Sequence, residues 1–444
     1  MKANTHLSLV GLIVLLIIGT ACKDGSTPTN SNNNNNNGPT PIPPEFACDN
    51  GLSDGTFDCQ NINLVARISA ADLSGDGVND IWGWTDPDTQ KEYALVGLSD
   101  GVSFVDLSDP AAPELLGKLS ESSPKALGAA GSGKTVPHGV LDEDEKSSLW
   151  RDMKVYNNHL FVVSDGQVHG MQVFDLTRLR NVANPPESFS EDAFYDQFVA
   201  AHNIAINEES GYAYAVGSDT YGGGLHIIDI SDPLNPVFAG FHADSSFGRN
   251  NTGYVHDTHC VNYTGPDPDH AGREICVNSG ETHVVIADVT DKTATSTIGS
   301  VTYGGRGYVH QGWLTEDHRY FILGDEFDER QNQHGTRTYI FDVTDLDNPV
   351  LLNTYTAGTG SIDHNLYVKG DLLYQSNYTS GLRILDISDI ASGTLTEVGF
   401  FDTYPSDDDA KFDGSWSNYP YFESGLIIVS DMSNGLFILQ PNLQ

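Results

Sequence analysis

Short apolar runs recur along the chain from residue 50 onward, and clusters of Gly, Asn, Asp and Ser separate them. The clearest runs cover residues 93–97, 160–164, 212–216, 320–323 and 426–429. They are rich in Val, Ile, Leu, Tyr and Phe, which favours β-strands when turn residues bound the run. No helical periodicity competes with this pattern. The sequence therefore predicts an all-β chain built from successive hairpins.

A short motif follows these runs, with an aspartate between two apolar residues and a Ser or Thr soon after. The motif positions are Asp106, Asp175, Asp229, Asp288, Asp342 and Asp386, and Gln440 marks a degenerate seventh copy. Successive copies lie about 44 to 69 residues apart, which is the size of a propeller blade. In five copies a glycine stands five residues before the motif position, where a strand would leave a tight turn. The repeat predicts a seven-bladed β-propeller.

The seventh blade has no outer strand after its motif, because the sequence ends soon after Leu439. Residues 63–68, Asn-Leu-Val-Ala-Arg-Ile, are a candidate for that strand. An N-terminal strand that completes the last blade would close the ring and remove exposed sheet edges. We expect one domain over residues 47–444.

The first residues have the order of a bacterial secretion signal. Lys2 precedes an apolar run at residues 7–18, and small residues at 19–21 precede Cys22. This order resembles the lipobox of bacterial lipoproteins, which predicts a signal peptide over residues 1–21 and acylation of Cys22. The apolar run is too short to span a bilayer permanently, and the alternative is an ordinary cleaved signal without a lipid.

Residues 22–46 contain a run of asparagines at 32–37 and several prolines, a composition too polar to bury anything. We interpret this segment as a disordered, flexible tether. Lys23 and Asp24 beside the cysteine resemble the surface-export signal of Bacteroidetes lipoproteins. The expected location is therefore the bacterial cell envelope, in the outer membrane, with display on the cell surface as one option.

The chain has five cysteines. With Cys22 assigned to the lipid, the other four form two local pairs, Cys48 with Cys59 and Cys260 with Cys276, in an oxidising compartment. The alternative is that these four residues are buried free thiols.

The formal net charge of −39 argues against two classes of partner. Nucleic acids and anionic membranes are held by clusters of Lys and Arg, which this chain lacks. We expect contact with a membrane only through the N-terminal lipid. Such acidity favours solubility and cation binding.

Several longer stretches carry a family likeness. They cover residues 79–87, 92–97, 150–152, 169–182, 310–315 and 363–367. These stretches resemble the choice-of-anchor B family of LVIVD-repeat proteins. The resemblance implies a secreted β-propeller that is fixed to the envelope by varying anchors, here an N-terminal lipid. It implies no particular reaction.

Aligning the start of each predicted innermost strand gives one position per blade that faces the mouth of the central channel. These positions are Asp80, Arg151, His202, His256, His310, His364 and Trp416. The loop of blade five adds Asp325 and Glu326, followed by Asp328 and Glu329. Neutral imidazoles suit zinc, copper, iron or nickel, so the four histidines with Asp325 and Glu326 predict a transition-metal site. The alternative is that each histidine fastens its blade to the neighbouring backbone.

A second cation candidate lies at Asp72, Ser74, Asp76, Val78 and Asp80, with Gly77 at the sixth position. This spacing matches a calcium loop, although Gly83 replaces the bidentate glutamate at position twelve. The alternative is a solvated Asp/Gly turn. Asp80 cannot serve both this loop and the channel.

Residues 128–135 match the phosphate-loop pattern, but their surroundings do not. A working phosphate loop needs a strand before it and a helix after it, whereas Pro124 precedes this segment and Pro137 follows it. We therefore expect no nucleotide. A Gly-x-Ser-x-Gly nucleophile elbow is also missing from the sequence.

Three functions follow from these features. The first is an envelope-anchored platform that binds a protein, glycan or small ligand through its top face and channel. The second is a metal-dependent extracellular enzyme, a hydrolase or oxidoreductase, with Glu326 or Asp325 as proton acceptor. The third is a purely structural role.

Overall fold

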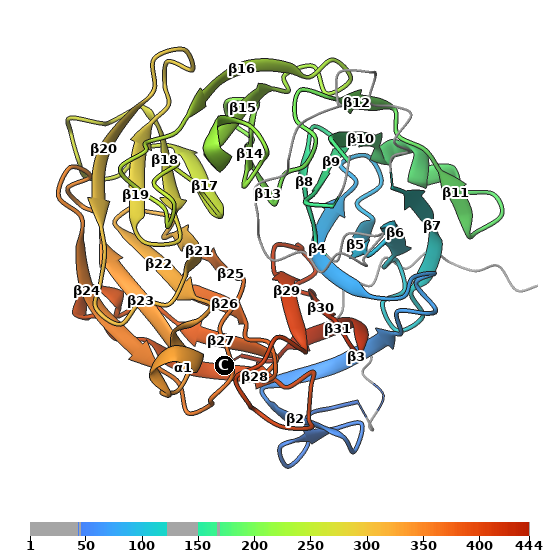
Figure 1. The fold of residues 1–444 in the computed structure, drawn as a ribbon. Helices are drawn as coiled ribbons and strands as arrows, with labels where there is room; N and C mark the ends of the chain where they lie inside the picture. Colours follow the sequence, from blue (N-terminus) through green and yellow to red (C-terminus); the bar gives the residue numbers. More distant parts are fainter. Residues whose placement is uncertain (1–42, 44–45, 122–149, 167–168, 444) are drawn as a thin grey trace, which may run out of the picture. The chain divides into compact units, whose positions relative to one another are not determined.

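The computed structural model describes residues 43, 46–121, 150–166 and 169–443. In this part of the chain, seven sheets, each built on four antiparallel strands, stand around a central channel with the first strand innermost (Figure 1). The predicted seven-bladed β-propeller is therefore confirmed. The predicted signal peptide, Cys22, most of the tether and the phosphate-loop match lie outside the described residues.

The strands of blades one to three are as follows. Blade one contains β4 (Val78–Thr85), β5 (Glu92–Leu98), β6 (Gly101–Asp106) and β7 (Glu114–Ser120). Blade two contains β8 (Arg151–Tyr156), β9 (His159–Ser164), β10 (Met171–Asp175) and β12 (Ala193–Tyr195). Blade three contains β13 (Asn203–Asn207), β14 (Tyr212–Val216), β15 (Leu225–Asp229) and β16 (Val237–His242).

The remaining blades follow the same order. Blade four contains β17 (Asp257–Asn262), β18 (Glu274–Ser279), β19 (Val284–Asp288) and β20 (Ser296–Val301). Blade five contains β21 (Val309–Leu314), β22 (Tyr320–Asp325), β23 (Arg337–Asp342) and β24 (Val350–Thr356). Blade six contains β25 (Leu366–Lys369), β26 (Leu372–Ser376), β27 (Leu382–Asp386) and β28 (Thr396–Phe401). Blade seven contains β29 (Ser415–Tyr419), β30 (Ile427–Asp431), β31 (Gly435–Pro441) and β3 (Ile62–Ile68).

Short elements complete the sheets and their connections. The strands β1 (Leu52–Ser53) and β2 (Phe57–Gln60) extend blade six, and β11 (Glu187–Phe189) pairs in parallel with β7 of blade one. The helical turns of the described chain are α1 (Asp328–Asn332), η2 (Leu176–Asn181), η3 (Tyr221–Gly223) and η4 (Ile390–Ser392).

The apolar runs of the sequence are the second strands of their blades. Every residue of β5 is buried, because each blade packs between two neighbours and a middle strand is covered on both faces. The outer strands are less covered, and β24 exposes most of its side chains. This explains why the second strands read as continuous apolar runs rather than as alternating ones.

The repeated aspartate ends the third strand of its blade and fixes the turn that follows. In each of the six copies with Asp, its carboxylate accepts a hydrogen bond from the backbone N–H two residues later. The six distances range from 2.7 Å at Asp106 to 2.9 Å at Asp175, Asp229, Asp288 and Asp342. An Asp side chain that mimics a backbone turn in this way accounts for the motif without a binding role.

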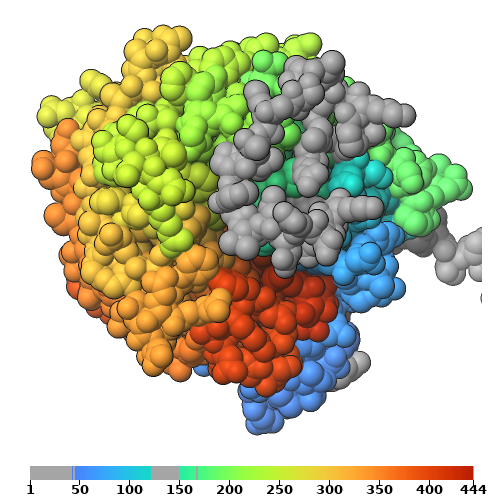
Figure 2. Space-filling model, in the orientation of Figure 1, coloured from blue at the N-terminus to red at the C-terminus, as the bar shows by residue number. Residues whose placement is uncertain are grey.

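The predicted closure of the ring is confirmed. Strand β3 pairs antiparallel with β31, from Ile62 opposite Pro441 to Ile68 opposite Leu436. In Figure 2 the blades follow one another around the ring in chain order, and the blue N-terminal segment lies against the red C-terminal blade. Leu64 of β3 is buried in the same hydrophobic cluster as Leu439 of β31.

Both predicted disulfides are present. Cys48 is bonded to Cys59 beside the β1–β2 hairpin, just before β3 begins. Cys260 is bonded to Cys276, its direct partner across β17 and β18.

Glycines lie at register shifts on the outer strands, and two of them, Gly240 and Gly299, allow the next blade to approach. The pairing of third and outer strands shifts register in six blades, and in four of them a glycine lies beside the shift. These are Gly117, Gly240, Gly299 and Gly399. A Cβ at Gly299 would lie 2.0 Å from the carbonyl oxygen of Leu346 in the next blade, so only glycine fits there.

We predict that Gly299→Ala destabilises the protein by about 1–3 kcal/mol, because the added methyl group must push two backbones apart. Gly304→Ala is the matched control, since a Cβ there meets no atom within 4 Å. Thermal unfolding followed by circular dichroism should show a lower Tm for the first variant alone. Equal Tm values for the two variants would contradict this account of blade packing.

Candidate functional site

The four predicted histidines lie next to one another at the end of the channel where the innermost strands begin, here called the top. The ring centroids are 4.4 Å apart for His202 and His256, 4.2 Å for His256 and His310, and 4.6 Å for His310 and His364. Trp416 continues the series 4.6 Å from His364. We call these five residues the histidine layer.

Two of these histidines fasten neighbouring blades. The Nδ1 of His256 lies 3.0 Å from the carbonyl oxygen of His310, and that of His364 lies 2.6 Å from the carbonyl oxygen of Trp416. A carbonyl only accepts, so Nδ1 donates in both contacts and each neutral ring keeps a lone pair on Nε2. One side chain can therefore do both things that the sequence suggested. Its Nδ1 fastens the neighbouring blade, and its Nε2 keeps a lone pair that can bind a metal. His202 differs, because its Nδ1 lies 3.2 Å from Asp165.

Glu326 faces two histidines from the loop after β22. Its carboxylate lies 3.8 Å from Nε2 of His310 and 3.7 Å from Nε2 of His364, and it accepts a hydrogen bond from the Tyr378 hydroxyl. Burial raises the pKa of Glu326 to about 7 and lowers the pKa of His364 to about 3. His310, Glu326 and His364 place one ligand atom each within 4.8 Å of one another.

The other predicted ligands, Asp325, His202 and His256, are not part of the group formed by His310, Glu326 and His364. Asp325 is buried, and its carboxylate accepts hydrogen bonds from the Tyr303 hydroxyl and from the backbone N–H groups of Gly307 and Tyr308. These bonds hold the preceding loop and leave Asp325 outside the group around Glu326. Although burial disfavours a charged imidazole, Asp165 raises the pKa of His202.

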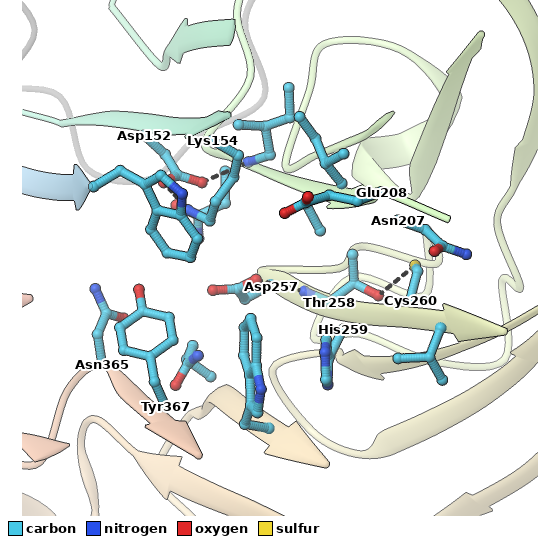
Figure 3. Close-up of a pocket in the computed structure, with 18 of the residues that line it drawn as sticks. Asp152, Lys154, Asn207, Glu208, Asp257, Thr258, His259, Cys260, Asn365 and Tyr367 are labelled. Carbon is cyan, nitrogen blue, oxygen red and sulfur yellow. Dashed lines mark hydrogen bonds and ion pairs between the residues drawn. The ribbon is translucent and has the colours of Figure 1, made fainter. Parts of the chain in front are cut away.

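Below the histidine layer the channel widens into a cavity of about 540 Å³ (Figure 3). Its upper level is made by the residues that directly follow the four histidines, Asn203, Asp257, Gln311 and Asn365, together with Asp80 and Asp152 of blades one and two. Asp80 thus lies one position further along its strand than the sequence alignment placed it. Two residues beyond, the walls are formed by Trp82, Lys154, His259, Trp313, Tyr367 and Tyr419.

Lys154 neutralises one side of this cavity. Its ammonium lies 2.6 Å from Asp152 and 3.9 Å from Asp80, and it also lies over the ring of Trp82 at 4.6 Å. Burial opposes ionisation of both carboxyls, but Lys154 lowers the pKa of Asp152, whereas burial raises the pKa of Asp80 well above its usual range. Lys154 therefore favours the ionised form of Asp152 more than that of Asp80.

Further polar groups line the cavity, and none of them forms an ion pair with Lys154 among the described residues. In Figure 3 the side chains of Asp257, Glu208 and Asn365 point into the open space. Burial raises the pKa of Asp257 to about 7 and also raises that of Glu208. One oxygen of Asp257 accepts a hydrogen bond from the backbone of Thr258 at 2.6 Å.

The sequence did not point to Asp152, Lys154, Asp257 or Glu208 as site residues. Side chains alternate along a strand, so the period leads from Asp152 to Lys154 and from Asp257 to His259. The predicted channel positions were the residues just before, Arg151 and His256, and from these the period leads to Met153 and Thr258 instead.

The predicted calcium loop is arranged as a turn before β4. Asp72 accepts a hydrogen bond from the Ser69 hydroxyl at 2.7 Å, and the Ser74 carbonyl accepts one from Lys118 at 2.8 Å. Asp80 lies in the channel, which was the other role considered for it. Calcium binding by Asp72, Ser74, Asp76 and Val78 stays a prediction.

Three stretches of the chain match the LVIVD repeat family, at residues 90–120, 200–243 and 363–403. The chain carries LVIVD repeats. The three matches fall in blades one, three and six, and each includes the second and third strands of its blade. No curated protein matches the chain.

Solved β-propellers resemble the fold. The Cps50 (Swd1) β-propeller domain of Myceliophteria thermophila is 13% identical, with a TM-score of 0.52 over 85% of this chain and 99% of that one. A chain of the mitotic checkpoint complex is 11% identical, with a TM-score of 0.50 over 96% of this chain and 99% of that one. At these identities the likeness shows the fold alone. None of the helices in the described ranges is long and apolar enough to cross a membrane.

We predict that Lys154→Met lowers the free energy of unfolding by about 3–5 kcal/mol at pH 7, because it leaves the buried Asp152 without the cation that pairs with it. Although burial opposes ionisation, Lys154 lowers the pKa of Asp152 in the unchanged protein, so the difference in stability between the two proteins should narrow as the pH falls through that lowered pKa. Urea unfolding at pH 7 and at a series of lower pH values measures both effects.

Lys91→Met is the control, because Lys91 pairs with Asp106 at the surface and should contribute at most about 1 kcal/mol. If both variants lowered the free energy of unfolding equally, the buried ion pair would stabilise the protein no more than the surface ion pair does.

Proposed function

We propose that this protein is an envelope-anchored binding propeller that holds a small polar ligand in its central channel. The cavity below the histidine layer is the observation that carries this proposal. Its volume of about 540 Å³ falls within the range of small-molecule sites, and it combines apolar walls with a few polar groups. Anchoring through a lipid on Cys22, and membership of the choice-of-anchor B family, are part of the same proposal and rest on the sequence.

The charges of the cavity select the chemistry of the ligand. Its lining carries Asp80, Asp152, Asp257, Glu208, Glu209 and Glu316 against the single cation Lys154, which Asp152 already engages. An anion would be repelled here. A ligand rich in O–H or N–H donors, uncharged or cationic, would find acceptors on Asp257 and Asn365. Trp313 and Tyr367 provide the aromatic surface on which a sugar face or an alkylammonium group packs.

We predict that the full-length protein binds neutral oligosaccharides or the polyamine spermidine, and not inorganic phosphate, in isothermal titration calorimetry. Asp257→Asn should weaken the binding at least tenfold, because it removes the acceptor charge and keeps the shape. Phe238→Ala, on the exposed outer edge of blade three, is the control and should leave affinity unchanged. Binding of phosphate alone, or equal affinity in Asp257→Asn, would refute this assignment.

A second function is supported by the group of His310, Glu326 and His364. Two neutral imidazoles and one carboxylate can hold zinc or another transition metal and leave a coordination position open, as a metal-dependent hydrolase or oxidoreductase requires. Glu326 would then bind the metal. It could not also be the proton acceptor suggested by the sequence, so another group would have to take that role.

For this second function, we expect hydrolase or oxidase activity that a chelator abolishes and that the double variant His310→Ala, His364→Ala lacks. The measurement is a substrate-panel assay before and after chelation and restoration with Zn²⁺. Activity that survives chelation, or a lack of activity in the metal-loaded protein, would leave the binding propeller as the better proposal.

A further inference from the structure

A second group of acidic side chains is buried in blade five, outside the channel site. Asp328 and Glu329 lie in the short helix α1, between β22 and β23, and Asp363 precedes β25. Their exposed fractions are 0%, 2% and 0%. Fully buried carboxylates are rare without a cation or a complete set of hydrogen bonds.

Each of these carboxylates has one oxygen with a hydrogen-bond donor. Asp328 accepts from the Tyr339 hydroxyl, Glu329 accepts from the backbone N–H of Arg337 at 3.0 Å, and Asp363 accepts from the backbone N–H of Asp325 at 3.1 Å. These donors fix the orientation of all three side chains.

The second oxygen of each carboxylate is different. Oδ1 of Asp328, Oε2 of Glu329 and Oδ1 of Asp363 are buried and have no hydrogen-bond partner among the described residues. Three buried acceptor oxygens without donors in one group would be costly for the fold, at about 1–3 kcal/mol or more each. A bound cation or a proton would satisfy these oxygens.

His334 completes the group from the loop after α1. Its Nδ1 lies 2.8 Å from the carbonyl oxygen of Gly335 and therefore donates to it, which leaves a lone pair on Nε2. That Nε2 has no hydrogen-bond partner among the described residues and lies 3.5 Å from Asp328. A ring held through one nitrogen by a backbone carbonyl, with the other nitrogen facing carboxylates, is the usual arrangement of a metal-ligating histidine.

The spacing fits a single ion. One ligand atom each of Asp328, Glu329 and His334 lies within 4.8 Å of the others, which is close to twice a metal–ligand bond of about 2.0–2.2 Å. Asp363 is a further buried carboxylate of this blade, outside the group of three whose ligand atoms lie within 4.8 Å of one another. The contact from His334 to Asp328 is the one ion pair that these carboxylates make within the described ranges.

We infer that Asp328, Glu329 and His334 bind one divalent transition-metal ion of the manganese or zinc class. Two carboxylates and one imidazole nitrogen suit these ions better than calcium, which prefers oxygen ligands alone. The ion would tie the short helix α1 to the loop that follows it. This site is independent of the ligand in the cavity and of the group around His310.

The test is metal binding by the full-length protein after chelation and desalting. Titration with Mn²⁺ or Zn²⁺ alone should show a site that Glu329→Gln and Asp328→Asn each weaken at least a hundredfold. His310→Ala is the matched control, because it alters the channel group and leaves this site intact. Saturating metal should raise Tm in the unchanged protein and in His310→Ala, but not in the other two variants.

His334→Gln is a second variant that we expect to fold, because this side chain is partly exposed and the substitution leaves the buried carboxylates in place. The Mn²⁺ complex of the unchanged protein should show an imidazole nitrogen in electron spin-echo spectra, and that of His334→Gln should not. Metal binding that survives in Glu329→Gln would overturn the inference. So would a lack of any site in the unchanged protein, which would mean that a shared proton neutralises the carboxylates.

Discussion

The pairing of β3 with β31 is the contact on which the rest of the ring depends. Each blade of a propeller is covered on both faces by its neighbours, so a gap between the first and last blades would expose two apolar faces. Here the seventh blade takes its outer strand from the N-terminal side of the chain, and Leu64 and Leu439 are buried together across that junction. The disulfide between Cys48 and Cys59 secures the chain just before this strand begins.

Closure also creates the channel and arranges its chemistry in levels. Seven innermost strands enter side by side, and the histidines lie at or just before the start of their strands. The next residue of each strand contributes to a level rich in carboxylates, and the residues two positions further on form a level rich in aromatic side chains, because alternate residues of a strand point to the axis. One repeated position can carry both structure and chemistry, as His364 does when its Nδ1 binds the next blade and its Nε2 faces Glu326.

Much of the fold could be predicted from the sequence because the blade is a local unit. The aspartate motif, the apolar second strands and the closing strand at residues 63–68 are each visible within a few residues. The site was harder to predict, because its members come together only through the ring. The histidines were found by their period, whereas Lys154 and Asp257 needed the strand register.

The acidic group of blade five shows the same limit. Asp328 and Glu329 were visible as a charged run, but their burial depends on how the loop folds over β23. Asp363 lies far away in the sequence, and Asp325, which belongs to the same run, supports the backbone instead. Spacing along the chain could not separate the carboxylates that we propose as metal ligands from Asp325, which holds the backbone of a loop.

The way the ring closes sets an order of events during synthesis. Strand β3 is among the first elements to be synthesised, but its partner β31 is among the last. The closing contact spans almost the whole described chain, and contacts between distant segments form slowly. Until the contact forms, the three strands of blade seven and the lone β3 are open edges, which can pair with other chains. Synthesis therefore leaves a period in which these edges are a defined target for chaperones.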